Sequence, residues 1–434
     1  MDLIEEALNI LKINSVTQTG NIEIVTYLSQ LLKKVELPFT IQETTHRGVL
    51  QQNLICQIDG QTSKHILFNT HLDTVNPGDP KKWHTTNYNP FNPVIDGDKL
   101  YGLGSADVKV DYLCKLKALL KYKGKKFINP LTFVGTYGEE MGLVGCHYFL
   151  KSDFVKPTYA FVGEPTELNL VYAHKGMVVI RIEIPLNDNS DQKDETLEFI
   201  GESAHGSTPL LGKNAITIGV NELKQLPTNC ELLSINGGSA VNMVPIHSTI
   251  DIARTNNTPN RDKIINTFEL LDEIQQILYQ HEDLEYDPPH SNFNIGTVKT
   301  EANSVIMRVA FRMLPKSDFK FTLDKIQSEL NKVGIEVILE RDQPPMYVSK
   351  ESFIVQKSKE ILEQLNIPPN LLTKPTSTEA AHYQQFGAEA VIFGSGRSEG
   401  NIHKPNEFNY ISQIEKSVLF YEKVIESFCL NEVR

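Results

Sequence analysis

Apolar residues recur at helical spacing in six stretches of the chain. In residues 3–11, for example, Leu3, Ala7 and Leu11 share one face, and the stretch ends in a polar segment. Such spacing is typical of amphipathic helices that pack against a core on one side. The pattern predicts helices over residues 3–11, 25–32, 112–120, 214–226, 323–330 and 411–428.

Short apolar runs alternate with these helices and predict buried strands at 66–68, 131–137, 159–162 and 390–393. Strands that alternate with helices favour an α/β fold with a mostly parallel sheet flanked by helices. The alternation stops near residue 175, where strands at 178–184 and 305–313 and a few helices indicate a smaller α+β domain. We therefore predict one domain from residues 1–174 and 316–434, interrupted by an inserted domain at 175–315.

Histidines and acidic residues follow the predicted strands of the first domain. Ligands in α/β sheets bind at the carboxyl ends of the strands, so these side chains are expected to meet at one edge. Three carboxylates and two imidazoles suit two divalent cations, with one carboxylate bridging; zinc is favoured, and cobalt or manganese are alternatives. The predicted metal ligands are His71, Asp107, Glu140, Glu164 and His403.

Two further acidic residues lie beside these candidates. Glu139 is left over from the ligand set, and a free carboxylate next to an activated water can act as the general base of a hydrolase. Asp73 stands two residues after His71, where a carboxylate can orient a metal-binding imidazole. A His-x-Asp sequence alone is also common in ordinary loops, so the prediction depends on the whole set.

Charge and cysteine content narrow the functional classes. The chain has 434 residues, a net charge of -12 and five scattered cysteines without a Cys-x-x-Cys pair. The acidic balance disfavours a nucleic acid or an anionic membrane as partner. Scattered cysteines are typical of reduced thiols in a cytoplasm, and the N-terminus lacks the basic and apolar pattern of a signal peptide. We expect a soluble, cytoplasmic protein.

Six ordered motifs resemble the zinc-dependent aminoacylase and carboxypeptidase family that includes acetylornithine deacetylase, succinyl-diaminopimelate desuccinylase and glutamate carboxypeptidases. The resemblance implies that His71 and Glu164 hold one metal, that Glu140 and His403 hold the other, and that Asp107 bridges them. It also implies that Glu139 is the base and Asp73 the residue that orients His71. The motifs are His71-Leu72-Asp73-Thr74-Val75, residues 100–107, Gly138-Glu139-Glu140, Gly163-Glu164-Pro165-Thr166, Ala204-His205-Gly206-Ser207 and Ile402-His403-Lys404-Pro405.

The same resemblance makes the inserted domain a lid and dimerisation domain. His205 would reach the active site of the partner subunit and help to stabilise the oxyanion, which implies a homodimer. The family's Gly-Gly, Asn and Val-Pro segment occurs at 237–245, and a degraded second copy precedes Phe311-Arg312. A local duplication would explain this, and it leaves Arg254 and Arg312 as alternatives. We assign the predicted substrate contacts to Asn242, Arg312 and Thr378.

The substrate implied by the resemblance is a small N-acyl amino acid. The Thr378-Glu379-Ala380 sequence and the segment 172–176 resemble the deacetylase branch, which favours hydrolysis of N-acetylornithine to ornithine and acetate, a step of arginine biosynthesis. A desuccinylase of the sister branch, or a metallo-carboxypeptidase or dipeptidase acting on small peptides, is the alternative. A catalytically silent metal-binding scaffold is a rival from a different class.

Overall fold

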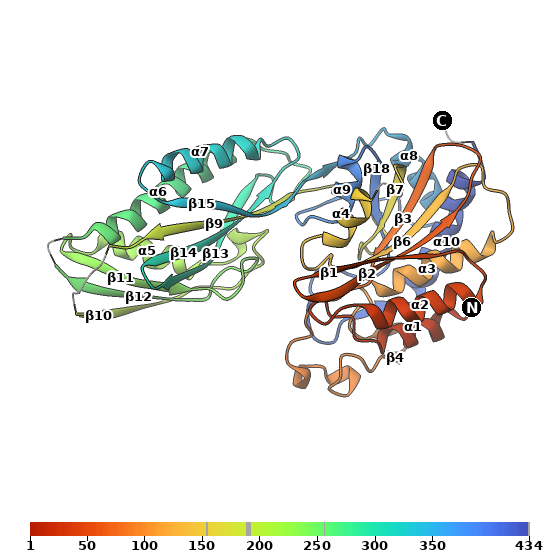
Figure 1. Ribbon diagram of the computed structural model, residues 1–434, viewed down its shortest axis with the longest axis horizontal. Coiled ribbons are helices and arrows are strands. Elements are labelled where there is room, and N and C mark those ends of the chain that lie inside the picture. Colours follow the sequence, from red (N-terminus) through yellow and green to blue (C-terminus); the bar gives the residue numbers. More distant parts are fainter. Residues whose placement is uncertain (153–154, 188–191, 256, 433–434) are drawn as a thin grey trace. The chain divides into compact units, whose positions relative to one another are not determined.

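The computed structural model divides into two compact units (Figure 1). The described residues are 1–152, 155–187, 192–255 and 257–432. The first unit consists of Met1–Ala173, Met346–Leu372 and Thr378–Arg434, and the second of His174–Pro345 and Thr373–Ser377. Among the described residues, no helix combines the length and the apolar character needed to cross a bilayer.

The boundary predicted at 174/175 lies within one residue of the observed one, but the predicted return to the first domain at residue 316 needs correction. The chain re-enters the first unit only at Met346. The reason is that strand β15 (Glu336–Gln343) pairs with β9 (Gly176–Pro185) in the sheet of the second unit. Helix α7 (Phe319–Asn331) contacts β15 and therefore stays in the second unit as well.

The first unit is built on a nine-stranded sheet whose centre is parallel. Its order is β1-β2-β6-β3-β7-β18-β8-β16, and β17 pairs with β8. Strands β6, β3, β7 and β18 run parallel to one another, whereas β2 pairs antiparallel with β6, and β8 pairs antiparallel with β18. The strands are β1 Thr40–His46, β2 Val49–Ile58, β3 His65–His71, β6 Leu131–Thr136, β7 Pro157–Gly163, β8 Leu170–His174, β16 Met346–Tyr347, β17 Leu371–Lys374 and β18 Glu389–Phe393.

Helices cover both faces of this sheet, which is why its central strands are apolar at consecutive positions. Leu67 of β3 packs in a cluster with residues of α4 and α9, whereas the neighbouring Phe68 contacts Tyr421 of α10 and Phe161 of β7. A small separate sheet has the order β19-β5-β4, from Phe408–Tyr410, Lys99–Tyr101 and Val94–Asp96. The helices are α1 Leu3–Leu11, α2 Ile22–Lys34, α3 Lys109–Lys121, α4 Val144–Lys151, α8 Phe353–Gln364, α9 Ala380–Gln385 and α10 Ile411–Val424, and a π-helical turn follows at Ile425–Cys429.

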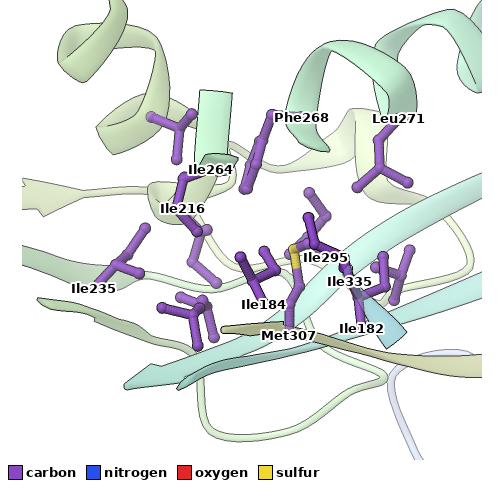
Figure 2. Close-up of a cluster of buried hydrophobic side chains, with 14 of the residues drawn as sticks. Ile182, Ile184, Ile216, Ile235, Ile264, Phe268, Leu271, Ile295, Met307 and Ile335 are labelled. Atoms are coloured by element: carbon purple, nitrogen blue, oxygen red, sulfur yellow. The ribbon is translucent and has the colours of Figure 1, made fainter. Parts of the chain in front are cut away.

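In its described residues, the second unit has a seven-stranded antiparallel sheet and three α-helices. Its order is β10-β12-β11-β13-β14-β9-β15. Apolar side chains of the strands pack with residues of the helices in one large cluster, in which Phe268 and Leu271 of α6 face Ile295 and Met307 of the sheet (Figure 2). The remaining elements are β10 Glu195–Ile200, β11 Cys230–Gly237, β12 His247–Arg254, β13 Asn292–Glu301, β14 Ser304–Met313, α5 Ala215–Gln225 and α6 Pro259–Tyr279.

The two copies of the Gly-Gly segment lie on neighbouring strands of this sheet. β11 and β12 form one antiparallel pair and β13 and β14 another, and the pairs meet where Gly237 is opposite Val298. Arg254 and Arg312 occupy matching positions near the ends of β12 and β14. The local duplication itself stays a hypothesis.

A buried ion pair connects the parallel strands of the first unit to α3 and α10. Asp111 and Lys115, one turn apart on α3, are 2.6 Å apart and almost inaccessible to solvent. The Asp111 carboxylate also accepts hydrogen bonds from the hydroxyls of Thr70, at the end of β3, and Tyr421, both at 2.6 Å. A Cβ at Gly163, the last residue of β7, would lie 2.0 Å from Asp111 Oδ2, so β7 can approach only because this residue is glycine.

Replacing Asp111 with Asn is expected to lower the free energy of unfolding by about 3–5 kcal/mol, because it leaves the Lys115 ammonium buried without a counter-charge. Adding Lys115→Met to that variant removes the orphaned charge and is expected to restore part of the loss. Urea unfolding of the three proteins measures both effects. The control is Lys213→Ala, which removes an exposed pair with Glu202 and should cost less than about 1 kcal/mol. Equal losses for Asp111→Asn and the control would contradict the proposed role of the ion pair.

Candidate metal centre

The carboxyl ends of three adjacent parallel strands place His71, Glu140 and Glu164 at one edge of the sheet. His71 is the last residue of β3, which lies between β6 and β7. Glu139 and Glu140 lie in the turn after β6, and Glu164 directly follows β7. Parallel neighbours end on the same side of a sheet, so sequence positions far apart meet at this edge.

Asp107 links the two histidines. Its Oδ1 atom lies 3.2 Å from Nε2 of His71, and its Oδ2 atom lies 3.1 Å from Nε2 of His403. Each imidazole therefore faces a different oxygen of one carboxylate. The Glu140 Oε1 atom also lies 3.1 Å from Nε2 of His403, and the ligand atoms of Asp107, Glu140 and His403 are within 4.8 Å of one another. A carboxylate held between two imidazoles in this way could be shared by two divalent cations.

Glu139 and Glu164 lie within electrostatic reach of this group. Burial raises the pKa of Glu139 well above its usual value; the His71 imidazolium opposes this, and the charges of Glu164 and Glu140 add to it. Glu164 is 8% exposed. The group of three whose ligand atoms meet includes neither Glu139 nor the predicted ligands His71 and Glu164. The role of Glu139 as proton acceptor stays a prediction.

Asp73 acts on the site through the backbone. The Nδ1 atom of His71 lies 3.1 Å from the Asp73 carbonyl oxygen and 3.7 Å from its carboxylate, so the shorter contact that orients the imidazole is to the main chain. If Nδ1 of the neutral imidazole donates to that carbonyl, the lone pair is on Nε2, the nitrogen that faces Asp107. The Asp73 carboxylate instead accepts the backbone N–H groups of Glu139 and Glu140 at 3.1 and 3.3 Å and the Thr17 hydroxyl at 2.7 Å.

The donor set fits divalent cations. Burial raises the pKa of Glu140, and the neighbouring Asp107 charge adds to the effect. Burial would also raise the pKa of Asp107, but hydrogen bonds from His403 and His71 hold it well below its usual range. Burial opposes protonation of His403, yet Asp107 and Glu140 raise its pKa to about 11. Protons on the histidines thus balance excess negative charge, and metal ions bound by the same atoms would replace them.

Two buried acidic residues near the site were not predicted. Glu407 accepts the backbone N–H groups of Ala106 and Asp107 at 2.9 and 3.1 Å, and so holds the loop that carries the bridging carboxylate. It stands four residues after His403, close enough in sequence to have been considered. Glu379 accepts a hydrogen bond from the Thr136 hydroxyl, at the end of β6, at 2.8 Å. Burial raises the pKa of both carboxyls to about 7.

The predicted residues of the second unit gather on two adjacent loops and one strand. The Gly206 N–H donates to the Asn242 carbonyl at 2.7 Å, which places His205 and Asn242 side by side. Ser207 donates its backbone N–H to Nδ1 of His205 at 3.2 Å, so the ring hydrogen is on Nε2 in the neutral form. Arg312 is buried, whereas Arg254 is exposed, which favours Arg312 as the functional arginine of the pair.

Thr378, in the first unit, is 1% exposed. Its hydroxyl accepts the backbone N–H of Ala380 at 3.3 Å, at the start of α9. Its contact with a substrate stays a prediction.

Residues 67–427 match the family described as peptidase family M20/M25/M40. Among curated proteins, the acetylornithine deacetylase of Buchnera aphidicola subsp. Schizaphis graminum is 31% identical over 229 residues, which cover 48% of this chain and 55% of that protein. The enzyme of the same name from Vibrio cholerae is 32% identical over 199 residues, covering 46% and 47% of the two chains. The chain thus spans about half the length of the curated relatives it matches.

Among solved structures, the fold is similar to that of the aminoacylhistidine dipeptidase of Vibrio alginolyticus. The TM-score is 0.68 at 16% identity, and the superposition covers 100% of this chain and 97% of that one. At this identity the likeness concerns the fold alone.

Dialysis against a chelator followed by addition of Zn²⁺ is expected to load two ions per chain, because Asp107 offers one oxygen toward each histidine. His403→Ala should load one ion, since it removes the imidazole that faces Oδ2 of Asp107. Metal content measured by atomic emission tests both. His84→Ala, a histidine outside the set, is the matched control and should retain two. An unchanged two-ion content in His403→Ala would contradict the assignment of this ligand.

Proposed function

Since the chain belongs to peptidase family M20/M25/M40 and is a metal-dependent amide hydrolase, we propose that it removes the acyl group from an N-acyl amino acid. The favoured substrate is N-acetylornithine, cleaved to ornithine and acetate as a step of arginine biosynthesis. The names of the sequence relatives support this choice. The observation that carries the hydrolytic function is the contact of the two Asp107 oxygens with two different histidines.

The residues divide the work of hydrolysis. Two divalent ions, zinc being favoured over cobalt or manganese, would be held by His71, Asp107, Glu140, Glu164 and His403, and when bound would polarise the acyl carbonyl and acidify the attacking water. Glu139 takes the proton of that water, which suits a carboxyl whose pKa burial has raised. It then returns the proton to the departing amine, so that carboxylate and free amino acid leave. Asp73 holds the turn that positions Glu139.

The second unit would supply contacts to the substrate. His205 carries its hydrogen on Nε2, where it can donate to the developing oxyanion. We propose a homodimer formed through this unit, in which His205 serves the reaction centre of the other protomer, as the resemblance implies. Asn242 and Arg312 are the proposed substrate contacts, with Arg312 on the carboxylate. The proposed setting is the cytoplasm, with neither a nucleic acid nor a membrane as partner.

Small peptides are the second candidate substrate. The site cleaves an amide in either case, and the structural neighbours include the Vibrio dipeptidase and a metallo-carboxypeptidase of Sulfolobus solfataricus, with a TM-score of 0.65 at 17% identity over 98% of this chain and 99% of that one. A succinylated amino acid, as in the sister branch, is a further acyl variant. A silent scaffold would need neither the base nor a complete set of ligand residues, and this chain has both.

An assay of amine release by the zinc-loaded protein distinguishes these substrates. The panel consists of N-acetylornithine, N-acetylmethionine, succinyl-diaminopimelate and a few dipeptides. We expect the highest kcat/KM on N-acetylornithine and loss of turnover after chelation. A maximum of kcat/KM on dipeptides would identify the protein as a peptidase and would leave the proposed metal site unchanged. Absence of turnover on the whole panel, with two ions bound, would contradict the proposed function.

Glu139→Gln is expected to lower kcat by at least about a thousandfold, because the amide cannot accept the proton of the attacking water. Metal content should remain at the wild-type value, since Glu139 is not a proposed ligand. Steady-state kinetics and atomic emission on the same preparation measure the two quantities. Glu363→Gln, a change on α8 outside the site, is the control and should alter neither. Loss of metal together with activity would reassign Glu139 to the ligand set.

A further inference from the structure

The sheet of the second unit has one face covered by helices and one that carries polar residues. Phe311 of β14 belongs to the helix-side cluster, as do Val309 and Ile295. Alternate residues point to the opposite face. There Ala310 packs with Met177, Val179 and the loop residue Val241.

Two polar side chains stand directly opposite each other on that face. Asn292, the first residue of β13, is the cross-strand partner of Arg312 on β14. Side chains paired in this way have Cβ atoms about 4.5–5.5 Å apart and point the same way. Asn292 is 2% exposed and Arg312 is 3% exposed, so both are almost completely removed from solvent.

Both side chains keep unused hydrogen-bonding capacity. Within the described part of the chain, Oδ1 of Asn292 and Nε of Arg312 have no hydrogen-bond partner. Asn292 Oδ1 and Arg312 Nε therefore do not form a hydrogen bond with each other. A buried polar atom without a partner costs about 1–3 kcal/mol, which is a reason to look for a ligand.

The orientation of Asn292 is fixed by its surroundings. Its amide nitrogen faces the Ser207 carbonyl oxygen at 3.4 Å, which leaves the amide oxygen as the free end. The adjacent Ser291 hydroxyl accepts the Leu314 N–H at 2.9 Å and lies 2.6 Å from the Ser317 hydroxyl, so the start of β13 is tied to the end of β14. Ser207 also follows His205 by two residues, and Asn294, two positions along β13, donates to the Met243 carbonyl at 2.9 Å.

We propose that Asn292 is a specificity-determining residue, whose side-chain oxygen accepts the N–H of a substrate amide while Arg312 binds the carboxylate one carbon away. The free Nε–H of Arg312 can donate a hydrogen bond to an anion. The side-chain oxygen of Asn292 can accept a hydrogen bond from an N–H or O–H group. A carboxylate next to an amide N–H meets both demands and occurs in N-acyl amino acids and at the C-terminus of peptides. The inference rests on the proposed function, since it concerns how the same substrate is bound.

Replacement of the amide N–H by an ester oxygen tests this directly. Zinc-loaded Glu139→Gln protein, which should bind without turnover, is titrated calorimetrically with N-acetylornithine and with glycylalanine, each beside its ester analogue. The parent protein should prefer the amide of at least one pair. Asn292→Leu, which keeps the branched shape of the side chain but has no polar atom, is expected to weaken binding of that amide about tenfold and to leave binding of the ester unchanged, because only the amide has an N–H to donate.

Two further variants separate specific binding from damage to the fold. Arg312→Met should lower the affinity for the amide and for the ester by the same factor, because both compounds carry the carboxylate. Asn260→Ala removes a buried asparagine in the first turn of α6, whose side chain is hydrogen-bonded to the backbone of Asn187, and should lower Tm without changing either affinity. Asn292→Ala serves if the leucine variant does not fold.

The inference is overturned if the parent protein binds amide and ester equally, if Asn292→Leu weakens both by the same factor, or if no probe binds. Preference for glycylalanine over N-acetylornithine, with the amide discrimination lost in Asn292→Leu, would support the inference while contradicting the proposed deacetylase. The two proposals can therefore fail separately.

Discussion

The first unit depends on the balance of negative charge among several carboxylates that lie close together and are mostly removed from solvent. Asp107 and Glu140 meet at one edge of the sheet, Glu139 and Glu164 lie close enough for their charges to interact, and His71 and His403 contribute positive charge. At an effective dielectric constant of about 20, two like charges 4 Å apart repel by about 4 kcal/mol. Such a group persists only with bound cations or protons, so the chemistry of the site and the stability of the fold around it are coupled.

The surrounding scaffold holds these charges in place. The Asp111 and Lys115 pair joins α3 to the end of β3, and β7 comes close beside it. Glu407 fixes the backbone of the Asp107 loop, and Asp73 fixes the turn of Glu139 and Glu140. Each of these carboxylates accepts hydrogen bonds from the surrounding scaffold. Side chains held by such contacts can reach metal-binding geometry with little rearrangement.

The parallel sheet and the meeting of the ligands could be predicted because apolar runs locate strands, and parallel strands share one edge. The extent of the second unit could not be predicted in the same way, because the pairing of β15 with β9 is a contact between distant residues. Helix α6 was missed although Ile264, Phe268 and Leu271 have helical spacing. The roles of Glu407 and Asn292 depend on which backbone groups and strands lie beside them, and a residue type alone does not reveal this.

The proposed roles of the two units differ. The first unit carries the candidate metal ligands and the candidate base Glu139, which would act on the amide bond itself. In the second unit, Asn292 of β13 lies opposite Arg312 of β14. If this pair binds an amide N–H together with its neighbouring carboxylate, it selects the amino-acid side of the bond and leaves the acyl side open. Discrimination between an acetyl group and an aminoacyl group must then come from residues other than these two.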